Sequence, residues 1–223
     1  MLYYGPVTLK ASSTPELKKC QLELLDYCFR YQKSHIGSAF STLPALHKIY
    51  SNLRDKDRVI LSNGHAASAL YVVLSNFYGL DLDWLFENMG DHPKRDENLG
   101  IHCSTGSLGM GISVAVGMAI ASRDSTIHCL ISDGECAEGV VWESLAFAQS
   151  HHLDNLKVYV ILNGWSAYDA VNVTYLSTRL RAFLPSISII EVSNDFLELP
   201  KLRAHYEKLS EVTYKVVRKQ LES

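Results

Sequence analysis

The 223-residue chain contains little that would mark a secreted, membrane-bound or nucleic-acid-binding protein. Its formal net charge is −3 and its lysines and arginines form no dense run, so it offers no electrostatic footprint for nucleic acid or an anionic membrane. Residues 1–13 lack a secretory signal pattern, and the longest apolar stretch, at about 113–121, is too short to span a bilayer. We therefore expect a soluble cytoplasmic protein that acts on small molecules.

Cysteine is also scarce and unpatterned. The sequence has five cysteines and no CxxC pair. An odd, scattered set predicts neither a disulfide framework nor a zinc site, so we interpret most of them as small core residues. They are Cys20, Cys28, Cys103, Cys129 and Cys136.

What the sequence does contain is an alternation of strand and helix patterns, typical of a parallel sheet covered by helices. A length of 223 residues, 47% of them hydrophobic, suits a single α/β domain over 1–223, with 1–13 as an N-terminal arm. We expect about five parallel strands with helices on both faces, and a long irregular loop at 90–106. The strands are predicted at 58–61, 127–132, 157–162, 188–192 and 213–217, and the helices at 14–33, 43–53, 65–78, 108–121, 139–152, 175–183 and 199–209.

Two of the predicted strands end on side chains suited to a hard cation. Asp133-Gly134 follows the strand at 127–132, and Asn163-Gly164 follows the strand at 157–162. Ligands of open parallel sheets gather beyond the carboxyl ends of the strands, so these side chains are expected to meet there. One carboxylate, one amide oxygen and a diphosphate suit Mg²⁺. Each dipeptide alone is a common turn signal, and only the spacing between them favours a ligand pair.

The stretch from Ser132-Asp133-Gly134 to Asn163 resembles the thiamine diphosphate signature, which begins Gly-Asp-Gly and ends in Asn. Other segments resemble transketolase in particular, and they occur in the family's order from residue 14 to about 218. Each segment is weak alone, and together they are specific. They are Ser34-His35-Ile36-Gly37, Leu61-Ser62-Asn63-Gly64-His65-Ala66, Asp91-His92-Pro93, the run from Ser104 to Ala119, and the run from Asp133 to Gly139 with Trp142-Glu143.

The resemblance implies a thiamine diphosphate-binding fold and a set of cofactor ligands. Mg²⁺ would be bound by the side chains of Asp133 and Asn163 and by the backbone carbonyl of Trp165. His65 and the backbone of Gly134 would contact the diphosphate, and in addition the loop with Gly106 and Leu108 would contact the cofactor.

The resemblance also implies catalytic groups. His35, His65 and His92 would surround the reactive carbon and move protons on sugar hydroxyls, a task that suits the near-neutral pKa of histidine. Glu138 would reach across a dimer interface toward the partner's cofactor-activating glutamate. The small residues at 108–121 would permit close helix packing, either at that interface or within one subunit.

The sequence departs from the family in ways that bear on the substrate and on the assembly. Asp91 replaces a glycine before His92, and its negative charge is expected to repel phosphosugars. The family's second thiamine-binding domain, with its activating glutamate, is absent from the sequence. We therefore expect a split enzyme, in which a separate pyrimidine-domain subunit completes an α₂β₂ assembly.

The leading interpretation is transfer of a two-carbon ketol unit from a ketose to an aldose, with sugars or sugar phosphates as substrates. Two alternatives stay open. One is a subunit of a 2-oxo acid decarboxylating enzyme with the same cofactor, and His35 and His92 favour sugars over it. The other is a non-catalytic cofactor-binding subunit, which has little physical need for so many polar side chains.

Overall fold

The computed structural model describes residues 14–166, 169–192 and 206–223. The predicted arm at 1–13 and most of the helix predicted at 199–209 lie outside these ranges. Within them, four parallel strands form one sheet in the order β1-β2-β3-β4. The strands are β1 (Arg58–Leu61), β2 (Ile127–Ser132), β3 (Leu156–Leu162) and β4 (Ser188–Glu191). The helices are α1 (Pro15–Arg30), α2 (Ile36–Tyr50), α3 (Ala67–Tyr78), α4 (Leu82–Asn88), α5 (Met110–Ala121), α6 (Gly139–Ser150), α7 (Val173–Phe183) and α9 (Glu211–Glu222).

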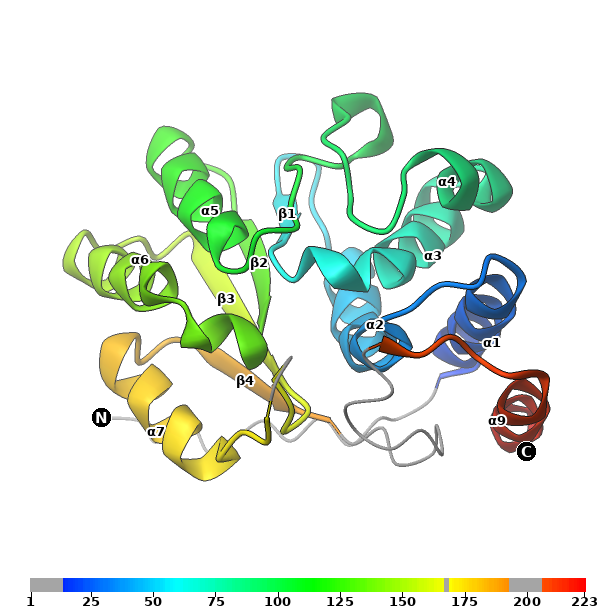
Figure 1. The fold of residues 1–223 in the computed structure, drawn as a ribbon. Helices are drawn as coiled ribbons and strands as arrows, with labels where there is room; N and C mark the ends of the chain where they lie inside the picture. Colours follow the sequence, from blue (N-terminus) through cyan, green and yellow to red (C-terminus); the bar gives the residue numbers. More distant parts are fainter. Residues whose placement is uncertain (1–13, 167–168, 193–205) are drawn as a thin grey trace.

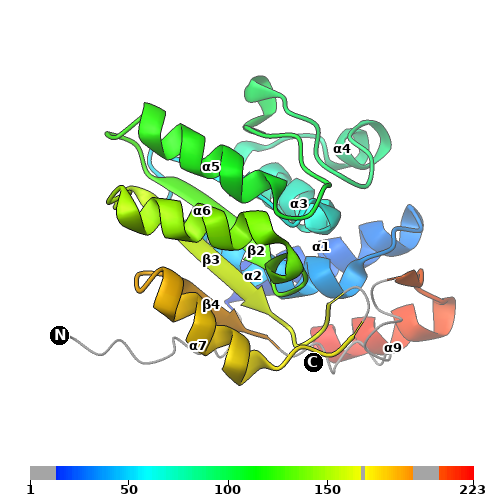
Figure 2. The ribbon, with the colours of Figure 1, turned by 60° about the vertical axis from the view of Figure 1, so that its left-hand side comes forward.

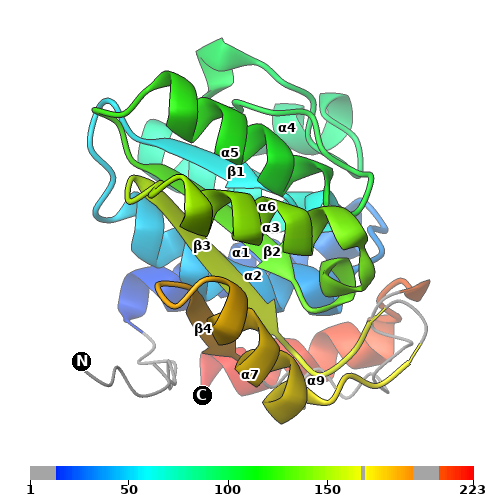
Figure 3. The same ribbon diagram turned by 90° about the vertical axis from the view of Figure 1, so that its left-hand side faces the viewer.

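Helices cover both faces of the sheet, as the sequence predicts (Figure 1). α5, α6 and α7 form one layer, which faces the viewer in Figure 3, and α5 and α6 pack side by side in it (Figure 2). α1, α2 and α3 lie on the opposite face. Successive residues of a strand point to opposite faces, so Leu130 belongs to the core under α2 and Ile131 to the core under α5.

Several predicted elements are confirmed with small changes at their ends. Thr14 caps α1, since its Oγ1 accepts a hydrogen bond from the Leu17 N–H at 3.2 Å. The predicted loop at 90–106 is irregular, apart from a short 3₁₀ turn at Glu97–Leu99. No helix in the described ranges combines the length and the apolar character needed to cross a membrane.

The strand predicted at 213–217 is wrong, because these residues belong to α9. Ser210 caps this helix by accepting a hydrogen bond from the Thr213 N–H, and Tyr214 and Val217 fall on the face that packs against α1. Tyr214 stacks on Phe29 of α1 with ring centroids 4.3 Å apart. The apparent alternation of polar and apolar residues was thus part of a helical repeat.

The second helix starts earlier than the prediction of residue 43. α2 begins at Ile36 and continues through Pro44. Its first two turns contain small and polar residues, which read as a loop in sequence but lie buried between the sheet and the neighbouring helices. α4 was not predicted at all. The early start of α2 matters because it brings polar side chains to the carboxyl edge of the sheet.

We predict that Val217→Ala lowers the free energy of unfolding by roughly 1–3 kcal/mol, because it removes buried methyl groups where α9 packs on α1. Val212→Ala is the matched control, since Val212 in the same helix is 74% exposed and its truncation should change the free energy by less than about 0.5 kcal/mol. Denaturant titration measures both. Equal effects would contradict the docking of α9 through Val217.

Candidate active site

The Asp133 carboxylate joins the carboxyl ends of the two central strands. Asp133 follows β2 and is 3% exposed. Its Oδ2 accepts hydrogen bonds from the backbone N–H groups of Asn163 at 3.0 Å and Gly164 at 2.8 Å, directly after β3. Its Oδ1 accepts one from the Gly134 N–H at 3.0 Å. Burial raises the pKa of Asp133 to about 6, although these hydrogen bonds act to lower it.

Asn163 is therefore held next to Asp133, as the spacing in the sequence predicts. Its side-chain oxygen accepts a hydrogen bond from the Trp165 N–H at 3.0 Å, and its side-chain nitrogen lies 3.5 Å from the Ser41 hydroxyl of α2. Both Asp133 and Asn163 line one pocket at this edge of the sheet. The lining is Ser38, Ser41, Thr42, Asn63, His65, Leu108, Ser132, Asp133, Gly134, Ile161, Asn163, Trp165 and Ser166.

Polar residues of α2 form one wall of this pocket, and the sequence analysis missed them. Ser38, Ser41 and Thr42 are spaced three and four residues apart, so they share a helix face. Thr42 accepts a hydrogen bond from the side-chain nitrogen of Asn63 at 2.9 Å. The other end of that amide, Oδ1 of Asn63, is buried without a partner among the described residues, which leaves an acceptor at the pocket for a bound group.

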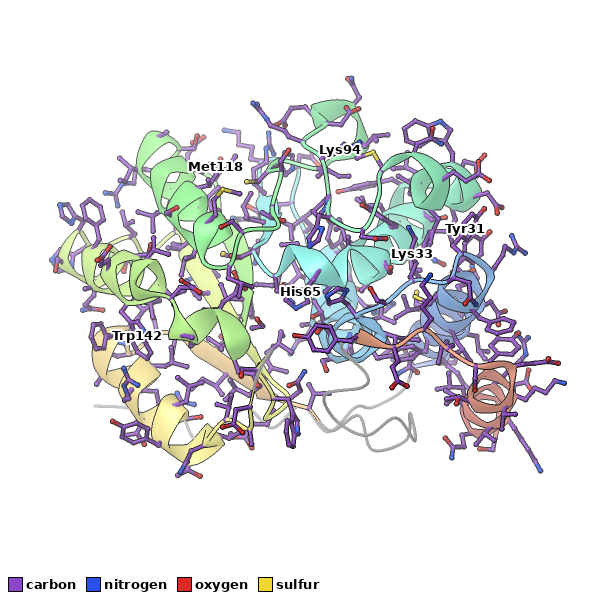
Figure 4. All side chains as sticks on the ribbon, viewed as in Figure 1. Tyr31, Lys33, His65, Lys94, Met118 and Trp142 are labelled. Atoms are coloured by element: carbon purple, nitrogen blue, oxygen red, sulfur yellow. The ribbon has the colours of Figure 1, made fainter. Side chains whose placement is uncertain are left out.

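The three predicted histidines meet beside the pocket. The ring centroid of His35 lies 5.5 Å from that of His65 and 6.5 Å from that of His92. His65 also lines the pocket and lies near the centre of the view in Figure 4. The three rings come from three separate segments: the start of α2, the turn after β1 and the loop after α4. The motif matches alone gave no information on this convergence.

The backbone of His35 is strained. Its φ of 60° and ψ of 24° place it in the left-handed region, where a non-glycine residue costs about 1–3 kcal/mol. Ser34 Oγ lies 2.8 Å from Nδ1 of the His35 ring. Such strain persists where the surroundings fix a conformation, and it clusters at functional sites.

The remaining predicted residues are placed in three ways. Leu108, Gly134 and Trp165 line the pocket itself. Gly106 lies against His92, since a Cβ there would come within 3.3 Å of the imidazole ring. Glu138 lies outside the pocket lining, on the exposed surface at the start of α6.

A buried glutamate supports the floor of the site, and it too was missed as a structural residue. Glu135 is 0% exposed. Its Oε1 accepts hydrogen bonds from the Ser62 hydroxyl at 2.6 Å and from the Gly109 N–H at 2.9 Å, and its Oε2 accepts one from the Ser132 N–H at 3.0 Å. It therefore ties the ends of β1 and β2 to the start of α5. Its position in the run Asp-Gly-Glu was the available signal.

The donor set of the pocket favours hard, oxygen-seeking ligands. Its described lining contains one carboxylate, that of Asp133, together with amide and hydroxyl oxygens, and neither lysine nor arginine. In the described part of the chain no three histidine, cysteine, aspartate or glutamate side chains are grouped as a metal site. A cation here would have to take one carboxylate plus neutral oxygens, which is the ligand mixture that Mg²⁺ accepts.

Comparison with known proteins decides the family. A family model described as "Transketolase, thiamine diphosphate binding domain" matches residues 25–183. The chain belongs to this family. Similar transketolase-family proteins include the 6-deoxy-6-sulfo-D-fructose transketolase subunit SqwG of Clostridium sp. (strain MSTE9), 34% identical over 149 residues, or 58% of this chain and 54% of that protein. One subunit of the apulose-4-phosphate transketolase of Phocaeicola vulgatus is 28% identical over 205 residues, or 81% of this chain and 72% of that protein.

Complete transketolases are longer than this chain. The Kluyveromyces lactis transketolase is 30% identical over 224 residues, which cover 86% of this chain but 33% of that enzyme. The chain thus spans about half of SqwG and one third of the yeast enzyme. The crystal structure of Pichia stipitis transketolase in complex with sedoheptulose 7-phosphate shares the fold with a TM-score of 0.74 at 21% identity, over 92% of this chain and 40% of that one.

We predict that Glu135→Ala lowers the free energy of unfolding by about 3 kcal/mol, because it leaves two buried backbone N–H groups without acceptors. Glu143→Ala serves as the control, since Glu143 is exposed on α6 and should change the free energy by less than about 0.5 kcal/mol. Denaturant unfolding followed by circular dichroism compares them. A loss no larger than that of the control would show that Glu135 does not hold the strand ends.

Proposed function

We propose that this chain is the diphosphate-binding subunit of a cytoplasmic transketolase, which transfers a two-carbon ketol unit from a ketose to an aldose together with a separate pyrimidine-domain subunit. The observation that carries the proposal is the Asp133 carboxylate bonded to the end of β3, beside three converging histidines. The family match over residues 25–183 supports the same cofactor. We take residues 1–223 as one diphosphate-binding domain.

The charge of the pocket favours a diphosphate held through Mg²⁺. A diphosphate beside the buried Asp133 carboxylate would be repelled, and no lysine or arginine in the described lining offsets that repulsion. A divalent cation removes it by binding the carboxylate and the phosphates together. The side chains of Asp133 and Asn163 and the carbonyl of Trp165 would hold the ion, while His65 and the Gly134 backbone would contact the phosphates. Leu108 and Gly106 would lie against the rest of the cofactor.

The histidine cluster suits proton transfer on a sugar. Thiamine diphosphate, when bound, supplies the nucleophilic carbon for cleaving a carbon–carbon bond next to a carbonyl. His35, His65 and His92 would bind the substrate hydroxyls, take up a proton as the bond breaks and return it as the new bond forms. Their centroid spacing of 5.5–6.5 Å lets neighbouring hydroxyls of one sugar bridge them.

The size of the pocket supports a site shared with a second polypeptide. The cavity within this chain measures about 60 Å³, whereas pockets that enclose a cofactor-sized ligand measure roughly 300–1,000 Å³. This chain therefore encloses only a part of such a cofactor. SqwG and its apulose-4-phosphate relative carry names that identify them as subunits, which fits a split enzyme.

The surface for the partner is proposed on α5 and the start of α6. α5 has no charged residue, yet Met110 and Ile120 are 39% and 45% exposed. A Cβ at Gly117 would meet nothing within 4 Å, so a neighbouring helix has room to approach there. Glu138 lies exposed next to this surface, where it would reach the partner's cofactor-activating glutamate in an α₂β₂ assembly.

We predict that neither polypeptide alone transfers a ketol unit and that the mixture does so with Mg²⁺ and thiamine diphosphate. A coupled assay with a panel of ketose donors and aldose acceptors, free and phosphorylated, measures it. Full activity from this chain by itself would contradict the shared site. Release of CO₂ from a 2-oxo acid by the mixture, without ketol transfer, would assign the chain to the decarboxylating class instead.

We predict that Asp133→Ala weakens Mg²⁺-dependent binding of thiamine diphosphate to the mixed complex by about 100-fold or more, because even residues that only support metal ligands contribute 10–100-fold. Asp154→Ala is the control, since Asp154 is exposed in the turn before β3. Isothermal titration calorimetry with and without Mg²⁺ measures both variants. Unchanged binding by the Asp133 variant would show that the metal site lies elsewhere.

A further inference from the structure

An ion pair joins the two loops that carry His35 and His92. Nζ of Lys33 lies 2.8 Å from Oδ1 of Asp91. Lys33 stands two residues before His35, and Asp91 stands directly before His92. The Lys33 side chain is 15% exposed, so the contact is partly shielded from water on the lysine side. Figure 4 labels Lys33 on the side of the chain formed by α1, α3 and α4, to the right of His65.

The loop with His92 is anchored to its own side of the fold by backbone contacts. The hydroxyl of the buried Tyr71 donates a hydrogen bond to the Gly90 carbonyl at 3.1 Å. The Pro93 carbonyl accepts one from the Thr105 N–H at 3.3 Å. These contacts hold the backbone on both sides of His92. They do not fix where His92 stands relative to His35.

The loop with His35 begins where α1 ends. The Lys33 N–H donates a hydrogen bond to the Cys28 carbonyl at 2.9 Å, which closes the helix end. His35 itself has the left-handed backbone described above, and the Ala39 N–H bonds to its carbonyl at 3.0 Å. A residue held in a strained conformation needs its surroundings to keep it there. Among the described contacts, the Lys33–Asp91 pair is a direct charged link from this loop to the other histidine loop.

The electrostatics of the pair also change the expectation for the substrate channel. The hydrogen bond and charge of Lys33 lower the pKa of Asp91, with smaller contributions from His92 and His35. Asp91 therefore stays ionised at neutral pH, and the ammonium of Lys33 neutralises the charge that was expected to repel phosphosugars. The sequence showed the aspartate but not its partner 58 residues earlier. The pair adds no net charge to the site.

We propose, resting on the proposed ketol-transfer function, that Lys33 and Asp91 are positioning residues whose ion pair sets the separation of the His35 and His92 rings. The pair replaces a side-chain-free position next to His92 with a bond that crosses between the two loops. A substrate bridged by the two rings then meets proton donors and acceptors that are already in place. The pair acts through the histidines and touches no reacting atom.

The test compares Lys33→Met, Asp91→Asn and the double variant, each in the complex with the pyrimidine-domain subunit. Each single variant should lower kcat by about 10- to 100-fold, since small misplacements of catalytic groups have effects of that size. KM for the ketose should change less than about threefold, because the pair does not bind substrate. The double variant should be no worse than the singles, because both remove the same bond. The affinity for thiamine diphosphate and the Tm should match the wild type.

The control is a second ion pair with similar geometry and no connection to the site. Lys56 Nζ lies 2.7 Å from Asp124 Oδ2, near the amino ends of β1 and β2. Lys56→Met and Asp124→Asn should leave kcat unchanged. If they reduced kcat as much as the Lys33 and Asp91 variants, the loss would be a general effect of removing surface charge, and the proposal would be overturned.

A readout independent of activity is the NMR spectrum of ¹³C-labelled histidine side chains in the complex. Lys33→Met should shift the ring signals of His92 as well as those of His35, although His92 is far away in sequence. If Lys33→Met leaves His92 unshifted, or if the single variants keep wild-type kcat, the proposal fails. It also fails if Asp91→Asn raises KM alone, since Asp91 would then bind substrate directly. Coupled histidine shifts in a wild-type complex without ketol transfer would overturn the proposed function and leave the positioning intact.

Discussion

The architecture of the site depends on one buried carboxylate. Asp133 accepts backbone hydrogen bonds from the residues that follow β3, so the ends of the two central strands cannot separate without leaving a charge unpaired in the interior. Glu135 does the same between β1, β2 and the start of α5. These two acids convert an open sheet edge into a fixed frame. The pocket and the histidines stand on that frame, which is why a small cavity can hold its shape before any ligand arrives.

The sequence predicted this frame well where local chemistry is specific. Strands that run into Asp133 and Asn163 meet because parallel strands present their carboxyl ends at one edge. The motifs around His35, His65 and His92 identified the right side chains, and the structure brings the rings together. The roles of these residues toward a cofactor stay predictions. Their proximity follows from topology, which short motifs do not encode.

The failures have a common physical origin in tertiary contacts. Residues 213–217 alternate like a strand, but capping by Ser210 and packing of Val217 on α1 favour a helix. The first turns of α2 are small and polar, and only their burial makes them helical. The bond between Lys33 and Asp91 joins positions far apart in the chain, so no local pattern reveals it. Contacts of this kind decide boundaries and charge balance more than intrinsic propensity does.

The uncharged helix α5 has a consequence for the life of the free polypeptide. A surface that leaves Met110 and Ile120 in contact with water gains free energy when any apolar surface covers it, including that of another copy. The lone chain is then exposed to clumping until its counterpart arrives. A cell that makes the two halves from separate genes therefore has reason to match their rates of synthesis, since an excess of this half would be lost as precipitate.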